Sequence, residues 1–159
     1  MSRFITNFAD VVKIPEPQTE EVCLNDRVIA CKRFMENVCQ SRNISLRLEL
    51  CEENPVVNID TSLFEQVIIN IIKNSAESIG EAGEIIIRTS ASPSMLEIGD
   101  TGQGISKDVE AKLFSPFFST KPNGQGIGLI FIREVLMKHH CTFSLRTYPD
   151  GITRFCICF

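Results

Sequence analysis

The stretch "DTSLFEQVIINIIKNSAESIGEAGE", residues 60–84, has the periodicity of an amphipathic helix. Asp60 is an N-cap candidate, and Gly80 and Gly83 are stop signals, so the pattern predicts a helix of about five turns. At about 100° per residue, apolar and polar side chains separate onto opposite faces. The apolar face holds Phe64, Ile68, Ile71, Ile72 and Ile79, and the polar face holds Gln66, Asn70, Lys73, Asn74 and Glu77.

Asn70 and Asn74 are unusual on such a face, because solvated helix faces usually carry Glu, Lys and Arg. Asparagine competes with the backbone for hydrogen bonds and lowers helix propensity. Its amide oxygen is a neutral hard ligand that suits a hydrated, phosphate-bound Mg²⁺. A plain solvated face is the alternative, and the stripe alone does not decide between them.

Composition narrows the class of protein. With 159 residues, 43% hydrophobic and 23% charged, the chain has the size and balance of one soluble globular domain. The net charge of −4 means that basic residues are not in excess, so nucleic acid is not expected as a partner. The sequence has no apolar run of 18 residues and no signal-peptide pattern. We therefore expect no direct membrane contact from this chain and a cytoplasmic location, with membrane anchoring of a larger parent left open.

The seven cysteines do not form a disulfide framework, because their number is odd and no C-x-x-C pair occurs. Cys31 and Cys39 share a helical stripe with Val28 and Met35, which indicates small core residues. Cys156 and Cys158 alternate along an expected strand. Reduced thiols in a cytosolic protein are predicted, without a zinc site.

The rest of the chain alternates between helical and strand patterns. Residues 2–12 have helical spacing and are followed by two prolines, which end a helix. Further helices are expected over 25–43, capped by Asn25 or Asp26, and over 128–140. Strands are expected over 21–25, 44–51, 55–60, 83–90, 94–100, 141–147 and 151–159, with 100–127 as a loop region. These elements predict an α+β two-layer sandwich, with three main helices on one face of a mixed sheet.

A first glycine loop, "IGDTGQGI" at residues 98–105, follows an expected strand. Asp100 ends that strand, and Gly102 and Gly104 leave room for a flat ligand. A carboxylate in this place suits a base with an exocyclic amine, such as adenine. An ordinary turn is the alternative.

A second glycine loop, "NGQGIGL" at residues 123–129, precedes a helix. Gly124, Gly126 and Gly128 expose backbone N–H groups beside a helix N-terminus, which favours phosphate. The loop lacks the GK[ST] of a Walker motif and the preceding strand of a dinucleotide fingerprint. Between the loops, "KLFSPFFSTK" at 112–121 has the composition of a lid held by Phe114, Phe117 and Phe118, although these phenylalanines also suit a core.

Taken in order, Asn70-x-x-x-Asn74, "DTGQG", "FSPFFSTK" and "GQGIGL" resemble the catalytic ATP-binding domain of sensor histidine kinases over about residues 20–159. The resemblance is nearest to the nitrogen-regulation-like class, in which "PFF(S/T)TK" leads almost directly into the second glycine loop. It implies the sandwich fold shared with gyrase and mismatch-repair ATPases.

The resemblance also implies roles for individual residues. Asn74 would hold the Mg²⁺ that bridges the ATP phosphates, and Asn70 would support that site. Asp100 would accept from the adenine amine, with Thr153 of "GITRF" near its water network. Lys121 would approach the terminal phosphates. The remaining ligand contacts would come from Gly102, Gly104, Ile105, Gly124, Gly126, Ile127, Gly128 and Leu129.

Two positions depart from the pattern. Thr101 stands where many relatives have Asn, and Glu77 stands where other classes place a base three residues after the Mg²⁺ asparagine. Lys73 is a candidate substitute for that base. A surface pair between Lys73 and Glu77 is at least as good a reading.

No phosphoacceptor histidine is evident, because His139 and His140 belong to a helix C-terminus. Residues 1–19 resemble the end of a dimerisation helix plus linker, and 20–159 the catalytic domain. The expected partners are an upstream dimerisation domain carrying the acceptor histidine, within a homodimeric parent, and a response regulator receiver domain.

The competing functions are an anti-sigma-factor serine kinase, a nucleotide module that binds without transfer, and a gyrase-type ATPase clamp. The serine kinases and the clamp usually have Glu at position 70.

Overall fold

A five-stranded mixed sheet forms one layer of the molecule in the computed structural model, which describes residues 13–114 and 127–159. Its spatial order is β2-β4-β5-β7-β6, with β2 and β4 parallel and the other neighbours antiparallel. The strands of this sheet are β2 (Ile44–Glu49), β4 (Gly83–Ala91), β5 (Ser94–Asp100), β6 (Thr142–Thr147) and β7 (Thr153–Cys158). A separate antiparallel pair joins β1 (Glu20–Cys23) to β3 (Val56–Ile59).

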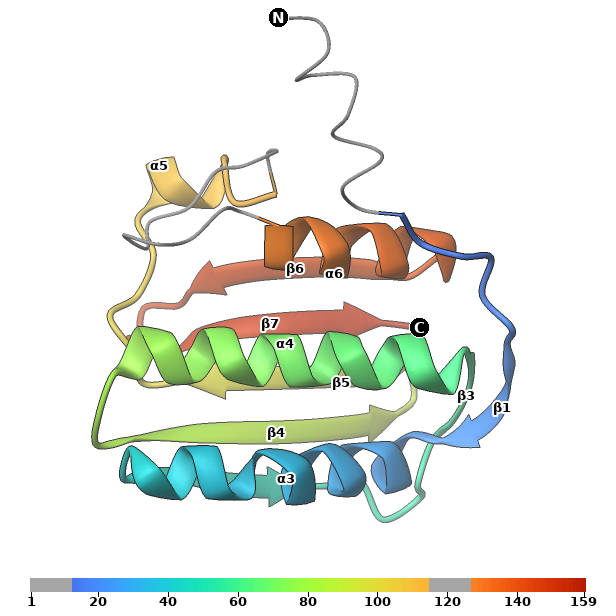
Figure 1. Cartoon of the computed structure of the whole chain (residues 1–159), viewed down its shortest axis with the longest axis horizontal. Helices are drawn as coiled ribbons and strands as arrows, with labels where there is room; N and C mark the ends of the chain where they lie inside the picture. The colour runs from blue at the N-terminus through green and yellow to red at the C-terminus, as the bar shows by residue number, and fades with distance from the viewer. Residues whose placement is uncertain (1–12, 115–126) are drawn as a thin grey trace, which may run out of the picture.

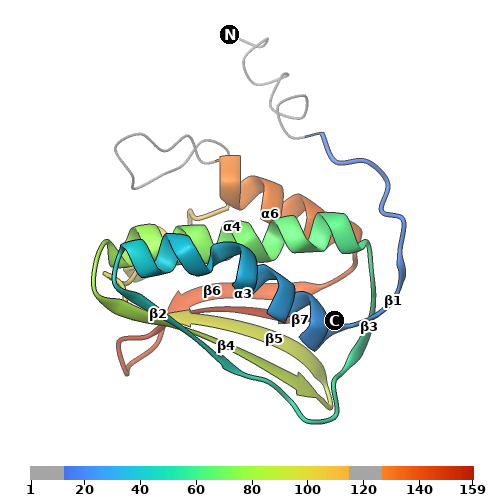
Figure 2. The ribbon, with the colours of Figure 1, turned by 60° about the horizontal axis from the view of Figure 1, so that its bottom comes forward.

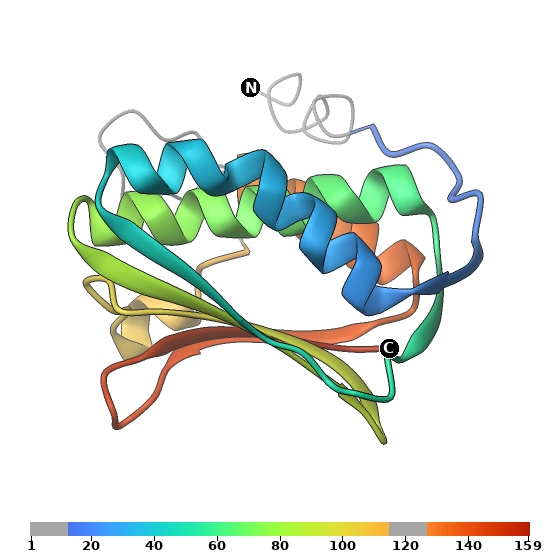
Figure 3. The same ribbon diagram turned by 90° about the horizontal axis from the view of Figure 1, so that it is seen from below.

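The second layer consists of α3 (Leu24–Ser41), α4 (Thr61–Ile79) and α6 (Ile127–Lys138). All three helices cover the same face of the five-stranded sheet, with α4 between the other two (Figures 1, 2 and 3). The predicted two-layer α+β sandwich is therefore confirmed. The expected loop region also contains a four-residue helix, α5 (Lys107–Glu110), whose N-cap Ser106 accepts from the Val109 N–H.

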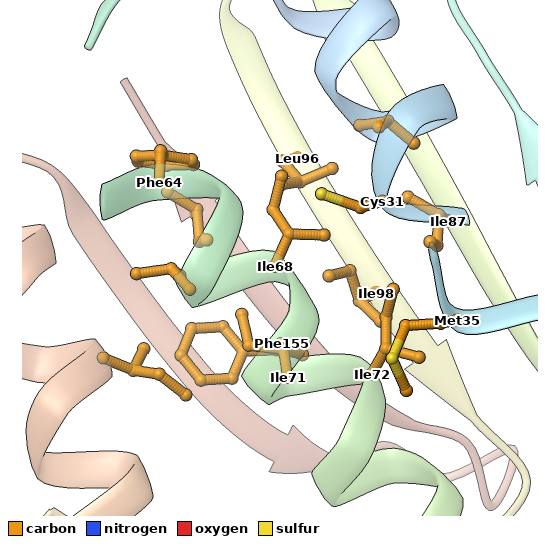
Figure 4. Close-up of a cluster of buried hydrophobic side chains, with 14 of the residues drawn as sticks. Cys31, Met35, Phe64, Ile68, Ile71, Ile72, Ile87, Leu96, Ile98 and Phe155 are labelled. Carbon is orange, nitrogen blue, oxygen red and sulfur yellow. The ribbon is translucent and has the colours of Figure 1, made fainter. Parts of the chain in front are cut away.

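Helix α4 forms where its sequence predicted. Asp60 caps it by accepting a hydrogen bond from the Leu63 N–H at 3.1 Å, and Gly80 ends it with a φ of 77°. Its isoleucine stripe packs against the inward-facing side chains of β4, β5 and β7, as Figure 4 shows. Burial of this stripe holds the two layers together, because most helical stability in proteins comes from packing an amphipathic face.

Helix α3 begins at Leu24, earlier than expected, and the predicted cap is wrong. Its N-cap is Cys23, with no side-chain cap. Asn25 is buried instead: its amide donates to the Cys51 carbonyl at 2.7 Å and accepts from the Thr89 hydroxyl at 2.7 Å. Because the Asn25 side chain bonds these two buried groups, it does not cap the helix N-terminus.

The cysteines of α3 are core residues, as predicted. Cys31 and Cys39 are buried free thiols, and burial raises the pKa of Cys31 to about 12. A thiol with this pKa stays protonated at neutral pH and behaves as a small apolar side chain.

His139 joins the end of α6 to the start of α4. Its Nδ1 lies 2.7 Å from the Val135 carbonyl, and its Nε2 lies 3.0 Å from the backbone N of Asp60. A carbonyl only accepts and an amide N–H only donates, so the ring carries its single proton on Nδ1. The C-terminus of α6 thus meets the N-terminus of α4, and the two helices run antiparallel.

Residues 13–19, which precede β1, are tied to the same junction. The Gln18 N–H donates to the Asp60 carboxylate at 2.8 Å, and Lys138 pairs with Glu16 at 3.2 Å. Burial acts to raise the pKa of Asp60, but hydrogen bonds from backbone N–H groups, including those of Leu63 and Gln18, contribute to a net lowering of this pKa. The helix expected over 2–12 lies outside the described residues. Among the helices that are described, none is long and apolar enough to cross a membrane.

Candidate functional site

The two asparagines of the polar stripe lie at the middle of α4, and both are partly exposed. Helix α6 has 12 residues and is anchored at its C-terminus to the start of α4. Since both helices rise about 1.5 Å per residue, the N-terminus of α6 lies level with about the twelfth residue of α4. That level falls between Asn70 and Asn74, and Figure 1 shows α6 beginning beside the middle of α4.

Asp100 ends β5 on the helix-facing side of the sheet, with 5% of its surface exposed. Burial raises the pKa of this carboxyl, while hydrogen bonds from the Gly102 N–H and the Ser75 hydroxyl act in the opposite direction. The Gly102 N–H donates to Oδ1 at 2.8 Å. An ionised carboxylate has about four acceptor positions, so Asp100 keeps capacity for a further donor.

Asp100 belongs to a row of three polar residues across the end of the sheet. Asp100 is the register partner of Thr153 on β7, and Thr153 is the partner of Thr147 on β6. Directly opposed residues of an antiparallel pair project on the same face, so all three side chains face the helix layer. The Thr147 and Thr153 hydroxyls are 2.7 Å apart. Thr153 is 4% exposed and pairs with Asp100 across the two strands.

The first glycine loop packs closely against α4 and β6. A Cβ at Gly102 would lie 2.2 Å from Ser78 Oγ, so only glycine fits. Gly104 has a φ of +82°, in the left-handed region that favours glycine. After this turn, the Ile105 N–H donates to the Thr147 hydroxyl at 2.7 Å. The loop is thereby fixed at both ends.

Thr101, which follows Asp100, extends the strand pairing. Its hydroxyl accepts from the Glu84 N–H at 3.0 Å, and its own N–H donates to the Glu84 carbonyl at 3.2 Å. These bonds extend the pairing of β4 and β5 beyond Asp100.

The second glycine loop is described only from its last residues. Lys121, Gly124 and Gly126 lie outside the described residues, as do Phe117 and Phe118. Ile127 begins α6, and Gly128 is exposed, with no contact to an added Cβ from the part of the chain that the structure describes. Leu129 is partly buried against the core. Phe114 packs edge-on against Phe143, with ring centroids 5.4 Å apart, so the start of the aromatic stretch is anchored on the sheet.

Three residues around Asp100 were missed from the sequence: Ser75, Ser78 and Thr147. Ser75 is buried beneath Asp100, and Ser78 accepts from the Gln103 N–H at 3.2 Å. Thr147 carried a usable signal, because it continues the inward alternation of Phe143 and Leu145. The two serines lie on the face of α4 beside the isoleucines, where nothing in the sequence distinguished them from small packing residues.

Replacing Gly102 with alanine is expected to cost about 1–3 kcal/mol of unfolding free energy, because the added methyl group forces the loop away from Ser78. Gly128→Ala is the matched control, since no atom within residues 13–114 and 127–159 is found within 4 Å of its Cβ position, apart from its chain neighbours and its own helix backbone. Urea unfolding of both variants measures the difference. Equal stability of Gly102→Ala and the unchanged chain would contradict the close packing described here.

Comparison with known proteins places the chain in a family. Residues 59–159 match the model described as "Histidine kinase-, DNA gyrase B-, and HSP90-like ATPase". This match covers α4, the whole Asp100 row and α6, and it spans more than half of the chain. The chain therefore belongs to this ATPase family.

Within the family, its relatives are sensor histidine kinases. The chain is 30% identical over 159 residues to the C4-dicarboxylate transport sensor protein DctS of Rhodobacter capsulatus, covering 96% of this chain and 24% of that protein. It is 28% identical over 142 residues to the sensor histidine kinase ZraS of Salmonella typhi, covering 87% of this chain and 30% of that protein. The chain thus spans less than a third of these relatives.

Solved structures agree with this placement. The nucleotide-free catalytic domain of histidine kinase ThkA superposes with a TM-score of 0.81 at 26% identity, covering 89% of this chain and 95% of that one. A second structure shows ThkA in complex with the response regulator protein TrrA, with a TM-score of 0.75 and 24% identity, covering 99% of this chain and 47% of that one. By fold, the chain resembles the catalytic domains of histidine kinases, in agreement with its membership of the ATPase family.

Proposed function

We propose that this chain binds Mg-ATP between α4 and the end of the sheet and donates the γ-phosphoryl group to a histidine on a separate helical domain. The observation that carries the proposal is Asp100, a buried carboxylate with spare acceptor capacity at the end of β5. A buried carboxylate needs a partner, and its environment opposes ionisation. A ligand that donates a hydrogen bond there would recover part of that cost.

The adenine end of the site follows from the Asp100 row. Asp100 accepts from the exocyclic amine, and Thr153 lies near the water network that joins Asp100 to the base. Gly102 and Gly104 let the loop backbone approach the ring, and Ile105 lines it. Gly102 lies so close to Ser78 of α4 that it has no room for a side chain. The loop backbone at this position is therefore bare, which supports its proposed approach to the base.

The phosphate end lies at the middle of α4. Asn74 holds Mg²⁺, and Asn70 supports it through water or a phosphate contact. Both side chains are partly exposed, and amide oxygens are ligands of the kind that Mg²⁺ accepts. The N-terminus of α6 lies at the same level and adds partial positive charge. Further phosphate contacts are assigned to Lys121, Gly124, Gly126, Ile127, Gly128 and Leu129. When bound, Mg²⁺ neutralises phosphate charge during transfer.

In the proposed reaction, an imidazole nitrogen of the acceptor histidine attacks the γ-phosphorus, and the bond to the β–γ bridging oxygen breaks. The products are phosphohistidine and ADP. Phosphoryl transfer depends mainly on positioning and charge neutralisation, so the chain's task is to orient ATP. His139 does not serve as the acceptor, since both of its ring nitrogens are engaged at the α4–α6 junction.

The proposed domain division is 1–19, the end of a dimerisation helix with its linker, and 20–159, the catalytic domain. The parent protein is proposed to be a homodimer that passes its phosphoryl group to a response regulator receiver domain. The ThkA–TrrA complex supports such a partner by analogy. A serine kinase or ATPase clamp is the weaker candidate, because Asn70 replaces the glutamate that those proteins usually carry.

The test combines this chain with a separately produced dimerisation domain that carries the acceptor histidine. With Mg-ATP, acid-labile phosphate is expected on that domain and not on this chain alone. Acid-stable phosphate on serine would support the serine-kinase alternative. ATP binding without any transfer would support the binding-only module.

A further inference from the structure

We propose that Thr147 is a positioning residue that fixes the hydrogen-bonding direction of Thr153 and thereby makes the site prefer adenine over guanine. The inference rests on the proposed nucleotide site. It goes beyond that site because Thr147 is assigned no contact with the nucleotide.

Thr147 is the point at which three segments meet. Its hydroxyl accepts from the Ile105 N–H at 2.7 Å, and its own N–H donates to the Glu110 carboxylate at 3.2 Å. The Cβ position of Gly104 lies 3.4 Å from the Thr147 hydroxyl oxygen. The last residue of β6 therefore ties the first glycine loop and α5 to the edge of the sheet.

The hydrogen bond from Ile105 gives the hydroxyl chain a direction. A threonine hydroxyl has one proton and two acceptor positions, and the Ile105 N–H occupies one of the latter. Accepting that bond polarises the Thr147 O–H and strengthens it as a donor toward Thr153, 2.7 Å away. In this arrangement the Thr147 hydroxyl donates to Thr153 Oγ1, so the Thr153 proton points away from Thr147.

Thr153 is almost fully buried beside Asp100, and its proton has a defined use there. Asp100 accepts, and Thr153 donates, directly or through one water. Adenine presents a donor amine next to the acceptor N1, which matches this pair. Guanine presents the acceptor O6 next to the donor N1–H, which opposes both groups. A site built for one hydrogen-bonding pattern rejects the reversed pattern strongly.

Thr147→Val keeps the shape and removes the hydroxyl, and Thr147→Ser restores it. Thr142→Val, at an exposed position on the same strand, is the matched control. Calorimetric titration with non-hydrolysable ATP and GTP analogues measures the dissociation constants. We expect Thr147→Val to weaken ATP-analogue binding about 3- to 10-fold with little change for the GTP analogue. Thr147→Ser and Thr142→Val should keep the original ratio.

An unaltered ratio in Thr147→Val would overturn the inference, even if thermal stability falls, because a purely structural role predicts equal losses for both nucleotides. Amide hydrogen exchange without nucleotide provides an independent readout. The Ile105 amide should exchange faster in Thr147→Val than in Thr147→Ser, and equal protection would also overturn the inference. Failure of the unchanged chain to bind the ATP analogue would instead contradict the proposed function, while the exchange result would stand separately.

Discussion

Asp100→Asn is expected to weaken ATP-analogue binding about 10- to 150-fold, which corresponds to the loss of one hydrogen bond to a charged group. The Gly102 N–H bonds Oδ1 and would retain the asparagine oxygen on its side. The amide NH₂ would then face the adenine amine, donor against donor. Calorimetric titration in the presence of Mg²⁺ measures the change.

The same variant should be no less stable than the unchanged chain at neutral pH. Burial raises the pKa of Asp100, so ionisation of this carboxyl opposes folding. That cost is absent below the pKa of the unfolded chain and is fully present above the raised pKa of the folded chain. The Asp100→Asn side chain does not ionise, so this cost to the free energy of unfolding disappears, while the affinity for nucleotide falls. Asp26→Asn, at an exposed position in the first turn of α3, is the control and should change neither property appreciably. Unchanged affinity in Asp100→Asn would contradict the adenine assignment.

Asn74→Ala is expected to abolish the dependence of ATP binding on Mg²⁺ and to reduce phosphoryl transfer about 100- to 1,000-fold. The estimate follows from the loss of one group that stabilises charge in the transition state. Binding is measured with and without Mg²⁺, and transfer is measured with the separately produced acceptor domain.

Gln66→Ala provides the comparison, because Gln66 is exposed on the same helix but lies two turns nearer its N-terminus. It should retain both the metal effect and the transfer rate. A metal effect that persists in Asn74→Ala would place the Mg²⁺ ligand on a different residue.

Much of the fold could be predicted, because local signals agreed with the tertiary arrangement. Asp60 and Gly80 bound α4 as expected, and β4, β5 and β7 lie within two residues of the strands expected over 83–90, 94–100 and 151–159. The errors arose where tertiary contacts override local preference. Asn25 looked like a cap but is used to satisfy the buried Cys51 carbonyl and the Thr89 hydroxyl.

Individual site residues could be predicted from the sequence, but the hydrogen bonds that join them could not. Asp100 and Thr153 were assigned through a family resemblance, and the structure brings them together as register partners. Thr147 was missed because its importance depends on strand register and on a loop N–H that reaches it from 42 positions away. Such a contact has no local sequence signal, although the alternation of β6 placed Thr147 on the correct face.

The most direct test of the central claim is a crystal structure of this chain with a non-hydrolysable ATP analogue and Mg²⁺. The exocyclic amine of adenine should lie within hydrogen-bonding distance of the Asp100 carboxylate, with the metal held by the amide oxygen of Asn74. A nucleotide bound elsewhere, with Asp100 still contacting only Gly102 and Ser75, would contradict the account.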